Sequence, residues 1–110
     1  RAAFNVYNKR GSVFLENVYE NALALEIRKL SLKVDQQVPV KVHYDDSVVG
    51  DYVADLVVDG KVIVEIKAVS RPTEAHEVQL VNYLKATDVE VGLLINFGNE
   101  ITVRRKIFDQ

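Results

Sequence analysis

The sequence predicts an α/β protein in which a mixed β-sheet is flanked by helices. Short runs of β-branched apolar residues alternate with turn residues, two longer stretches repeat apolar residues at helical spacing, and one late run is continuously apolar. The last pattern is typical of a strand that is buried on both faces. The predicted order, α-α-β-β-β-α-β-β, is that of a helix-flanked mixed sheet.

Length and composition indicate one globular domain that spans residues 1–110. Hydrophobic residues make up 48% of the chain and charged residues 27%, and these ordinary values exclude disordered and coiled-coil proteins. The chain has no Cys, which excludes disulfides and thiolate metal sites. Because the chain opens with Arg1 rather than Met, we expect residues upstream of it to be missing.

The charge balance argues against a nucleic-acid binder that is held by bulk electrostatics. The formal net charge is −2, although cations bound by carboxylates would reverse the local field. No apolar run approaches the roughly 20 residues that span a bilayer, and no signal-peptide pattern is present. We therefore expect no membrane partner and a cytoplasmic location.

Two complete helices and the end of another are predicted. Residues 1–9 look like the last turns of a helix that stops at Gly11. Residues 13–31 are predicted to form a long helix. Its apolar stripe consists of Leu15, Val18, Tyr19, Ala22, Leu25 and Leu30. Residues 74–87 are predicted to form the other helix, with Thr73 as its N-terminal cap.

Five strands are predicted from apolar or alternating runs. They cover residues 33–44, 52–58, 62–67, 91–97 and 101–108. Pro39 makes the first an edge or bulged strand, because proline cannot donate a ladder hydrogen bond, and the last is also expected at an edge. Turn residues occur at Asp45-Asp46-Ser47, Gly50-Asp51, Asp59-Gly60 and Gly98-Asn99.

Asp55, Glu65 and Lys67 are charged residues inside two apolar strands that are joined as a hairpin. Charged groups are costly there unless something compensates them, so the three form either a buried ion cluster or a divalent-metal site. Carboxylates supply the oxygen ligands that Mg²⁺ prefers, and a lysine can position a water or stabilise negative charge on a phosphate. Without metal, crowding should raise the pKa of at least one of the two carboxyl groups.

The length of the hairpin loop decides whether Asp55 and Glu65 meet. Glu65 and Lys67 are two residues apart and share one face of their strand. A two-residue loop would point Glu65 away from Asp55, whereas a three-residue loop, Val58-Asp59-Gly60, would place them on one face. A metal site therefore requires an odd loop or a bulge.

Polar residues elsewhere have more than one interpretation. His76, Gln79 and Tyr83 recur at spacings of three and four and form a polar stripe on the second helix. A surface histidine explains His76 better than a metal ligand does, whereas Gln79 and Tyr83 fit packing and function about equally. Glu16 is, by helix geometry alone, a first-turn carboxylate. Arg104-Arg105-Lys106 is most simply a solvated edge strand, with a phosphate-binding patch as the alternative.

The hairpin pattern of Asp55 and then Glu65-x-Lys67 resembles the PD-(D/E)xK nuclease superfamily. The helix segment Gln79-Leu80-Val81-Asn82-Tyr83 resembles the Q-x-x-x-Y signature of its recombination-exonuclease branch. The whole chain is similar to one group within the superfamily, the GxxExxY proteins. The matching stretches are residues 14–20, 52–56, 62–68, 76–84 and 92–97. Val13 stands where the group's name motif has glycine, although Gly11 fits the same loop.

The resemblance implies a restriction-endonuclease-like core and a set of site residues. The metal ligands that it implies are Glu16, Asp55 and Glu65. It implies Lys67 as the catalytic lysine and Gln79 as a site residue, and we expect Tyr83, with Gln79, to orient Lys67 or the substrate. The expected cofactor is Mg²⁺, with Mn²⁺ as the alternative ion.

Our first hypothesis is a Mg²⁺-dependent nuclease that hydrolyses phosphodiester bonds of nucleic acid, DNA rather than RNA. In that case the side chains of Glu16, Asp55, Glu65 and Lys67 should converge in one cleft. The second hypothesis is a nuclease-fold binding module that no longer cleaves. The third is a structural homodimer that pairs through a sheet edge. Because Asp55, Glu65 and Lys67 are all present, the nuclease hypothesis is favoured over the other two.

Overall fold

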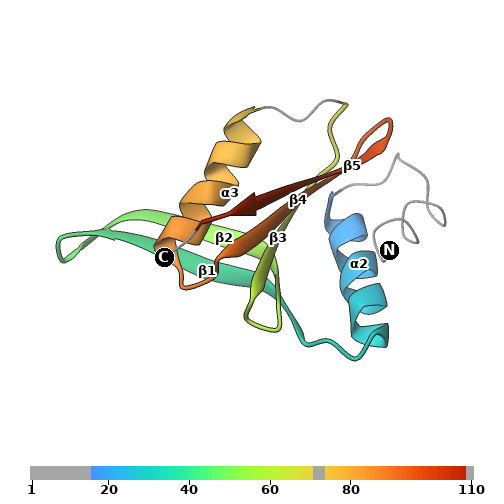
Figure 1. Cartoon of the computed structure of the whole chain (residues 1–110), viewed down its shortest axis with the longest axis horizontal. Helices are drawn as coiled ribbons and strands as arrows, with labels where there is room; N and C mark the ends of the chain where they lie inside the picture. Colours follow the sequence, from blue (N-terminus) through green and yellow to red (C-terminus); the bar gives the residue numbers. More distant parts are fainter. Residues whose placement is uncertain (1–15, 71–73, 109–110) are drawn as a thin grey trace.

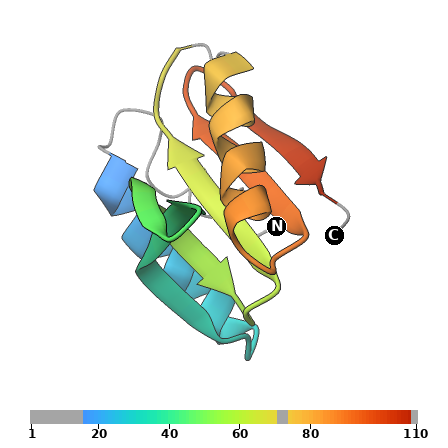
Figure 2. The same ribbon diagram turned by 90° about the vertical axis from the view of Figure 1, so that its left-hand side faces the viewer.

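A five-stranded sheet carries one helix on each face (Figures 1 and 2). The computed structural model describes residues 16–70 and 74–108. The elements are α2 (Glu16–Lys29), β1 (Val34–Tyr44), β2 (Ser47–Val58), β3 (Val62–Lys67), α3 (Glu74–Ala86), β4 (Val91–Phe97) and β5 (Ile101–Ile107). Neighbouring strands follow chain order, with β3 and β4 parallel and the other pairs antiparallel. This confirms the predicted mixed sheet, whereas the predictions for residues 1–9 and Thr73 lie outside the described residues.

α2 covers the sheet face that includes Leu56, Ile66 and Phe97. Tyr19 of α2 is fully buried and stacks on Phe97, with ring centroids 4.3 Å apart. The other apolar residues that α2 buries in this cluster are Leu23, Ala24 and Ile27. Because Phe97 ends β4, the stacked pair fixes the beginning of α2 near the ends of β3 and β4.

The predicted apolar stripe of this helix is partly wrong. Leu25 and Leu30 are each 56% exposed, and Leu15 lies outside the described residues. The buried face repeats every four residues through Tyr19 and Leu23, and Leu25 lies about 200° around the helix from Leu23. The contact with the sheet, rather than the apolar spacing within the helix, selects the side that is buried.

α3 covers the opposite face of the sheet. Leu80 and Leu84 of the helix are buried against Ile63 and Leu94 of β3 and β4. Gly92 permits this close packing, because a Cβ added there would lie 2.7 Å from Cδ1 of Leu80. The contact brings the middle of α3 over the centre of the sheet.

Alternation along β3 places Glu65 and Lys67 on the α3 side of the sheet. Ile63 belongs to the cluster under α3, whereas Val64 and Ile66 belong to the cluster under α2. Successive side chains of a strand point to opposite faces, so both charged residues share the face of Ile63. This confirms that Glu65 and Lys67 occupy one face.

The β2–β3 loop has the odd length that the metal-site prediction requires. Val58 pairs with Val62, which leaves the three residues 59–61 in the turn. Gly60 has a φ of 65°, a left-handed conformation that glycine adopts readily. The predicted odd length is confirmed, although the loop begins one residue later than Val58-Asp59-Gly60.

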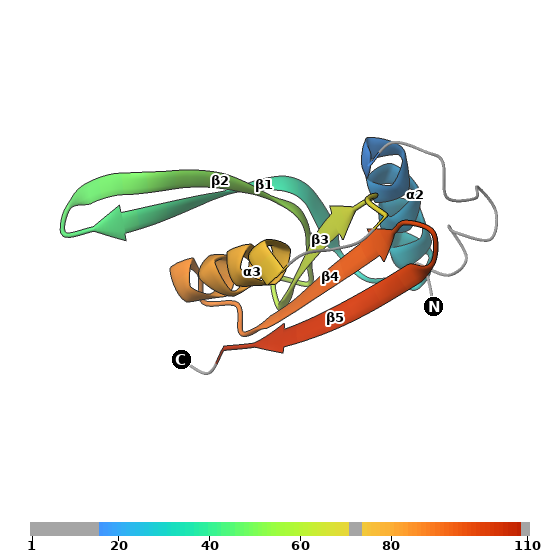
Figure 3. The ribbon, with the colours of Figure 1, turned by 90° about the horizontal axis from the view of Figure 1, so that it is seen from above.

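The β1–β2 hairpin extends beyond the body of the protein (Figures 1 and 3). It turns at Asp45-Asp46, as predicted. The predicted turn at Gly50-Asp51 is wrong, because both residues lie within β2 and Gly50 pairs with Val42. A Cβ added to Gly50 would lie 3.0 Å from the ring of Tyr52, so glycine makes room for this ring rather than for a turn.

β1 and β5 form the two edges of the sheet. Pro39 lies in β1, and the exposed Arg104 and Arg105 lie in β5. β4 is paired on both sides, and its residues Leu94 and Ile95 are buried on opposite faces. These positions confirm the predicted edge strands and the strand that is buried on both faces.

Candidate functional site

The β2–β3 hairpin brings Asp55 and Glu65 together. The register that pairs Leu56 with Val64 sets Asp55 level with Glu65 on the neighbouring strand, and the two side chains share a hydrogen bond. Asp55 Oδ2 also accepts a 2.8 Å hydrogen bond from the backbone N–H of Ile66. The odd loop therefore has the predicted consequence that the two carboxyl groups meet.

Glu65 is a buried carboxyl group, with only 8% of the residue exposed. Burial raises its pKa from 4.5 to about 9, and the charge of Asp55 and their shared hydrogen bond act in the same direction. The charge of Lys67 and a hydrogen bond with the backbone of Asp55 lower this pKa and offset only part of the rise. The prediction that one of the two carboxyl groups has a raised pKa is confirmed, although burial contributes more to the rise than the crowding by Asp55 does.

The buried end of Glu65 suits a divalent cation. Within the described residues, its Oε1 atom has no hydrogen-bond partner, which is uncommon for a buried polar atom in a native protein. A cation at Glu65 and Asp55 would supply the missing interaction and offset the repulsion between the carboxylates. Carboxylate oxygens are also the ligands that Mg²⁺ prefers.

Glu16 lies further along the backbone that follows β3. Its Oε2 atom accepts a 3.2 Å hydrogen bond from the backbone N–H of Ala68, two residues beyond the N–H that Asp55 binds. The pairing of β2 with β3 ends at Val64. Asp55 and Glu16 therefore bind backbone N–H groups of residues that lie beyond the end of this ladder. Among residues 16–70 and 74–108, no three Asp, Glu, His or Cys residues are grouped to hold a metal ion. Glu16 thus does not complete a three-carboxylate set with Asp55 and Glu65 here.

The end of β3 that carries Lys67 is held by Asn96 of β4. Lys67 pairs with Asn96 in the parallel ladder, and the Asn96 side chain, which is buried, hydrogen-bonds both backbone groups of Val69. Gly98 approaches the same segment so closely that an added Cβ would clash with the Val69 carbonyl oxygen. Sequence reasoning missed Asn96, although a lone amide near the end of an apolar run is a signal for it.

Gln37 of β1, which sequence reasoning also missed, approaches Asp55 from the neighbouring strand. Its side-chain amide donates to Oδ1 of Asp55 at 3.4 Å and to Oε1 of Glu20 on α2. Glu20 is buried, and its other oxygen accepts a 2.9 Å hydrogen bond from the Gln36 side chain. Two amides in an alternating strand, and a carboxylate next to the buried Tyr19, are the sequence signals for this cluster.

α3 places Tyr83 beside the carboxyl pair. Burial raises the pKa of the Tyr83 hydroxyl to about 12, and the charges of Glu65 and Asp55 add to the rise. The Tyr83 ring lies 5.4 Å from that of Tyr52 in β2. Gln79, one turn earlier, is half-buried and lines a cavity of about 490 Å³ together with Tyr83. The structure thus brings Tyr83 to the pair and Gln79 to the cavity beside it.

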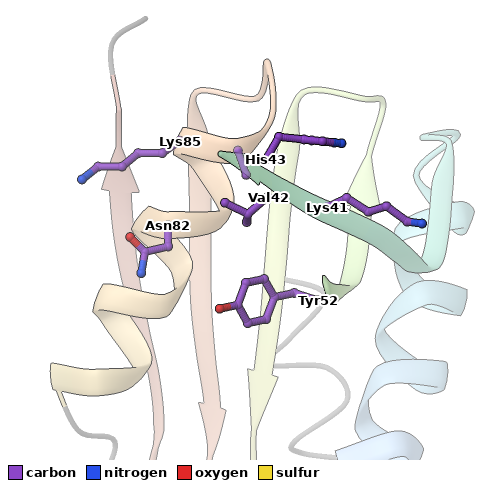
Figure 4. A pocket seen from close by; sticks show the side chains of 7 residues that line it. Lys41, Val42, His43, Tyr52, Asn82 and Lys85 are labelled. Atoms are coloured by element: carbon purple, nitrogen blue, oxygen red, sulfur yellow. The ribbon is translucent and has the colours of Figure 1, made fainter. Parts of the chain in front are cut away.

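A second cavity, of about 430 Å³, lies between the β1–β2 hairpin and α3 (Figure 4). Tyr52 and Asn82 line both cavities, so the two adjoin. Lys41 and Lys85 stand on opposite sides of this cavity, and their side chains point away from Tyr52 (Figure 4). Near Tyr52 this second cavity is therefore bordered by aromatic and amide groups rather than by ammonium groups.

Comparison with known protein families identifies the relationship of the chain. A family model of the PD-(D/E)XK nuclease superfamily matches residues 1–107. This chain belongs to the PD-(D/E)XK nuclease superfamily. Nucleases of this superfamily bind nucleic acid and typically use divalent metals. The superfamily and the restriction-endonuclease-like fold that the sequence resemblance implied are both confirmed.

A solved structure that resembles this PD-(D/E)XK chain is described as "Crystal structure of SSO0001". The two have a TM-score of 0.64 and 19% sequence identity, and the match covers 98% of this chain and 57% of that one. At this identity the likeness shows a shared fold, and the chain spans just over half the length of the other protein.

A search of curated proteins found no match. Within the described part of the chain, no helix is both long and apolar enough to cross a bilayer.

Proposed function

We propose that this PD-(D/E)XK chain is a Mg²⁺-dependent nuclease that hydrolyses phosphodiester bonds of DNA, and that it belongs to the GxxExxY group. The main support is the contact between Asp55 and Glu65, in which one oxygen of a buried carboxyl group has no hydrogen-bond partner among residues 16–70 and 74–108. Lys67 lies two residues beyond Glu65 on the same face of β3. A carboxylate pair with a neighbouring lysine suits metal-assisted phosphodiester chemistry.

Asp55 and Glu65 would hold the ion. When bound, Mg²⁺ would supply positive charge that keeps both carboxyl groups ionised and stabilises charge that develops on a phosphate. Glu16, which binds the Ala68 N–H, would add a further negative charge from α2 at the rim of the same site.

Lys67, Tyr83 and Gln79 would act on the substrate side. The ammonium group of Lys67 would position a water molecule or stabilise negative charge on the phosphate. Tyr83 keeps its proton at neutral pH because its pKa is about 12, so its hydroxyl can donate a hydrogen bond but cannot serve as a base. Gln79, at the adjoining cavity, would orient the nucleic acid.

A cleavage assay tests the proposal. Single- and double-stranded DNA and RNA are incubated with the chain in Mg²⁺, in Mn²⁺ or with a chelator, and cleavage of DNA is expected only with metal. Asp55→Asn and Glu65→Gln each remove one ligand charge while keeping the side-chain shape, so each should abolish cleavage. Glu100→Gln removes the charge of an exposed carboxylate in the β4–β5 turn and should leave cleavage unchanged.

Lys67→Ala separates catalysis from metal binding. Because the lysine acts on water or phosphate rather than on the ion, this variant should lose cleavage and still bind Mg²⁺. Lys61→Ala, in the exposed β2–β3 turn, is the matched control. If neither metal supports cleavage of any substrate, the chain is instead a nuclease-fold binding module. If Lys67→Ala cleaves as well as the parent, the catalytic role proposed for Lys67 is wrong.

A further inference from the structure

We propose that Gln37 is a positioning residue, which holds Asp55 in the orientation that binds the metal ion, and that Glu20 anchors Gln37 from α2. This inference rests on the proposed nuclease function. It assigns a role to two polar residues that lie outside the Asp55, Glu65 and Lys67 pattern.

The hydrogen bonds of Asp55 support this role. Its Oδ2 atom accepts from the backbone N–H of Ile66 at 2.8 Å, and its Oδ1 atom accepts from Nε2 of Gln37 at 3.4 Å. One donor on each oxygen restricts rotation of the carboxylate plane more than a single donor would. Partners of this kind orient the ligands of metal sites in general.

The backbone of Gln37 is unusual at the point where it approaches Asp55. Its φ is 53°, and this left-handed conformation is uncommon for residues other than Gly, Asn and Asp. The β1–β2 ladder has regular pairs on both sides, Gln36 with Leu56 and Val38 with Ala54, but no such pair between Gln37 and Asp55. Strained backbone that tertiary contacts maintain is concentrated at functional sites.

Glu20 links this arrangement to the packing of α2. The same Nε2 atom of Gln37 donates to Oε1 of Glu20, which an amide nitrogen with two hydrogens can do while it also donates to Asp55. Gln36 donates to the other oxygen of Glu20 at 2.9 Å. Because Glu20 follows Tyr19, whose ring is stacked on Phe97, the position of α2 determines the position of the Gln37 amide.

The decisive measurement is Mg²⁺ binding by titration calorimetry, in the absence of nucleic acid. Gln37→Gly removes the amide and keeps the left-handed backbone accessible, so it should fold and weaken Mg²⁺ binding by about 10- to 100-fold. Gln36→Ala is the matched control, because Gln36 also binds Glu20 but has no hydrogen bond to Asp55. It should retain the parent affinity for Mg²⁺, and melting in chelator verifies that both variants fold.

A double-variant cycle tests whether Glu20 and Gln37 act through one chain of contacts. Glu20→Ala removes both acceptor oxygens of the Gln36 and Gln37 amides and should weaken Mg²⁺ binding in the same direction as Gln37→Gly. If the two residues act in series, the double variant should bind no more weakly than Gln37→Gly alone. Independent, additive losses would overturn the anchoring role of Glu20.

Asp55→Asn distinguishes failure of this inference from failure of the proposed function. If Asp55→Asn loses Mg²⁺ binding while Gln37→Gly binds like the parent, the positioning role is overturned and the metal site remains. If Asp55→Asn itself binds Mg²⁺ like the parent, the metal site is misassigned and the positioning role fails with it.

Discussion

Asn96 binds both backbone groups of Val69 through the two ends of its side-chain amide. Its Oδ1 atom accepts from the Val69 N–H at 3.0 Å, and its Nδ2 atom donates to the Val69 carbonyl at 2.8 Å. The last backbone pair of the parallel β3–β4 ladder is Lys67 with Asn96. The amide therefore extends the ladder into the segment that contains Ala68, to which Glu16 is bound.

Asn96→Ala should destabilise the protein because it leaves both Val69 groups without their partner. Each buried polar group that loses its hydrogen bond costs about 1–3 kcal/mol. Because the two Val69 groups are only partly buried, the free energy of unfolding should fall by an amount in the lower part of the range of roughly 2–6 kcal/mol that two such groups give. Urea denaturation measures this change. Asn82→Ala, an exposed amide on α3, is the control, and an equal effect of both substitutions would contradict the role assigned to Asn96.

Gly98→Ala should destabilise the protein more than Gly60→Ala does. A Cβ at position 98 would clash with the Val69 carbonyl oxygen, which is backbone and cannot turn aside, whereas a Cβ at position 60 would meet no atom within 4 Å. The Gly60 variant should therefore show only the strain of its left-handed φ, about 1 kcal/mol. Denaturation of the two variants side by side is the measurement, and equal losses would refute the close approach at Val69.

The buried carboxyl of Glu65 should make stability fall as pH rises. Its pKa is about 9 in the folded protein and 4.5 as the reference for the unfolded chain, so the folded state holds a proton that the unfolded state releases between these values. The stabilisation is complete below pH 4.5 and is lost as pH rises through about 9. The contribution of Glu65 to the free energy of unfolding changes by at most about 1.4 kcal/mol per pH unit. Glu65→Gln should flatten this part of a urea-measured stability profile in chelator, and an unchanged slope would exclude Glu65 as its source.

Mg²⁺ should raise the melting temperature at pH 8, because it binds the folded site and not the unfolded chain. Asp55→Asn and Glu65→Gln should abolish this increase. In chelator, Asp55→Asn should melt at a higher temperature than the parent, since it removes a charge that raises the pKa of Glu65. Thermal melts in Mg²⁺, Ca²⁺ and chelator measure these shifts, and identical parent melting temperatures in all three would count heavily against the site.

The sequence was sufficient to predict that Glu65 and Lys67 share one face of the hairpin, because that placement depends on local rules. Strand alternation alone places Glu65 and Lys67 on one face, and loop parity decides whether Asp55 joins them. Leu25 illustrates the limit of such rules. It fits an apolar helical stripe, yet the sheet packs against a different side of α2 and leaves it 56% exposed.

The contacts around the carboxyl pair could not be predicted because they depend on tertiary structure. Gln37 adopts a left-handed backbone without being Gly, Asn or Asp, so its residue type does not indicate the conformation. Its partner Glu20 is 17 residues away in the sequence. Asn96 likewise looks like one more member of a strand until its distant partner, Val69, is known.

The two outer strands also protect the sheet from growing. Pro39 has no N–H to offer a further strand along β1, and a second copy that added itself to β5 in antiparallel fashion would bring arginines next to arginines at positions 104 and 105. Proline and positive charge at open strand edges are the usual means by which proteins avoid uncontrolled sheet extension. Substitutions that remove the charges of Arg104 and Arg105 in β5 should therefore make the chain more prone to aggregate.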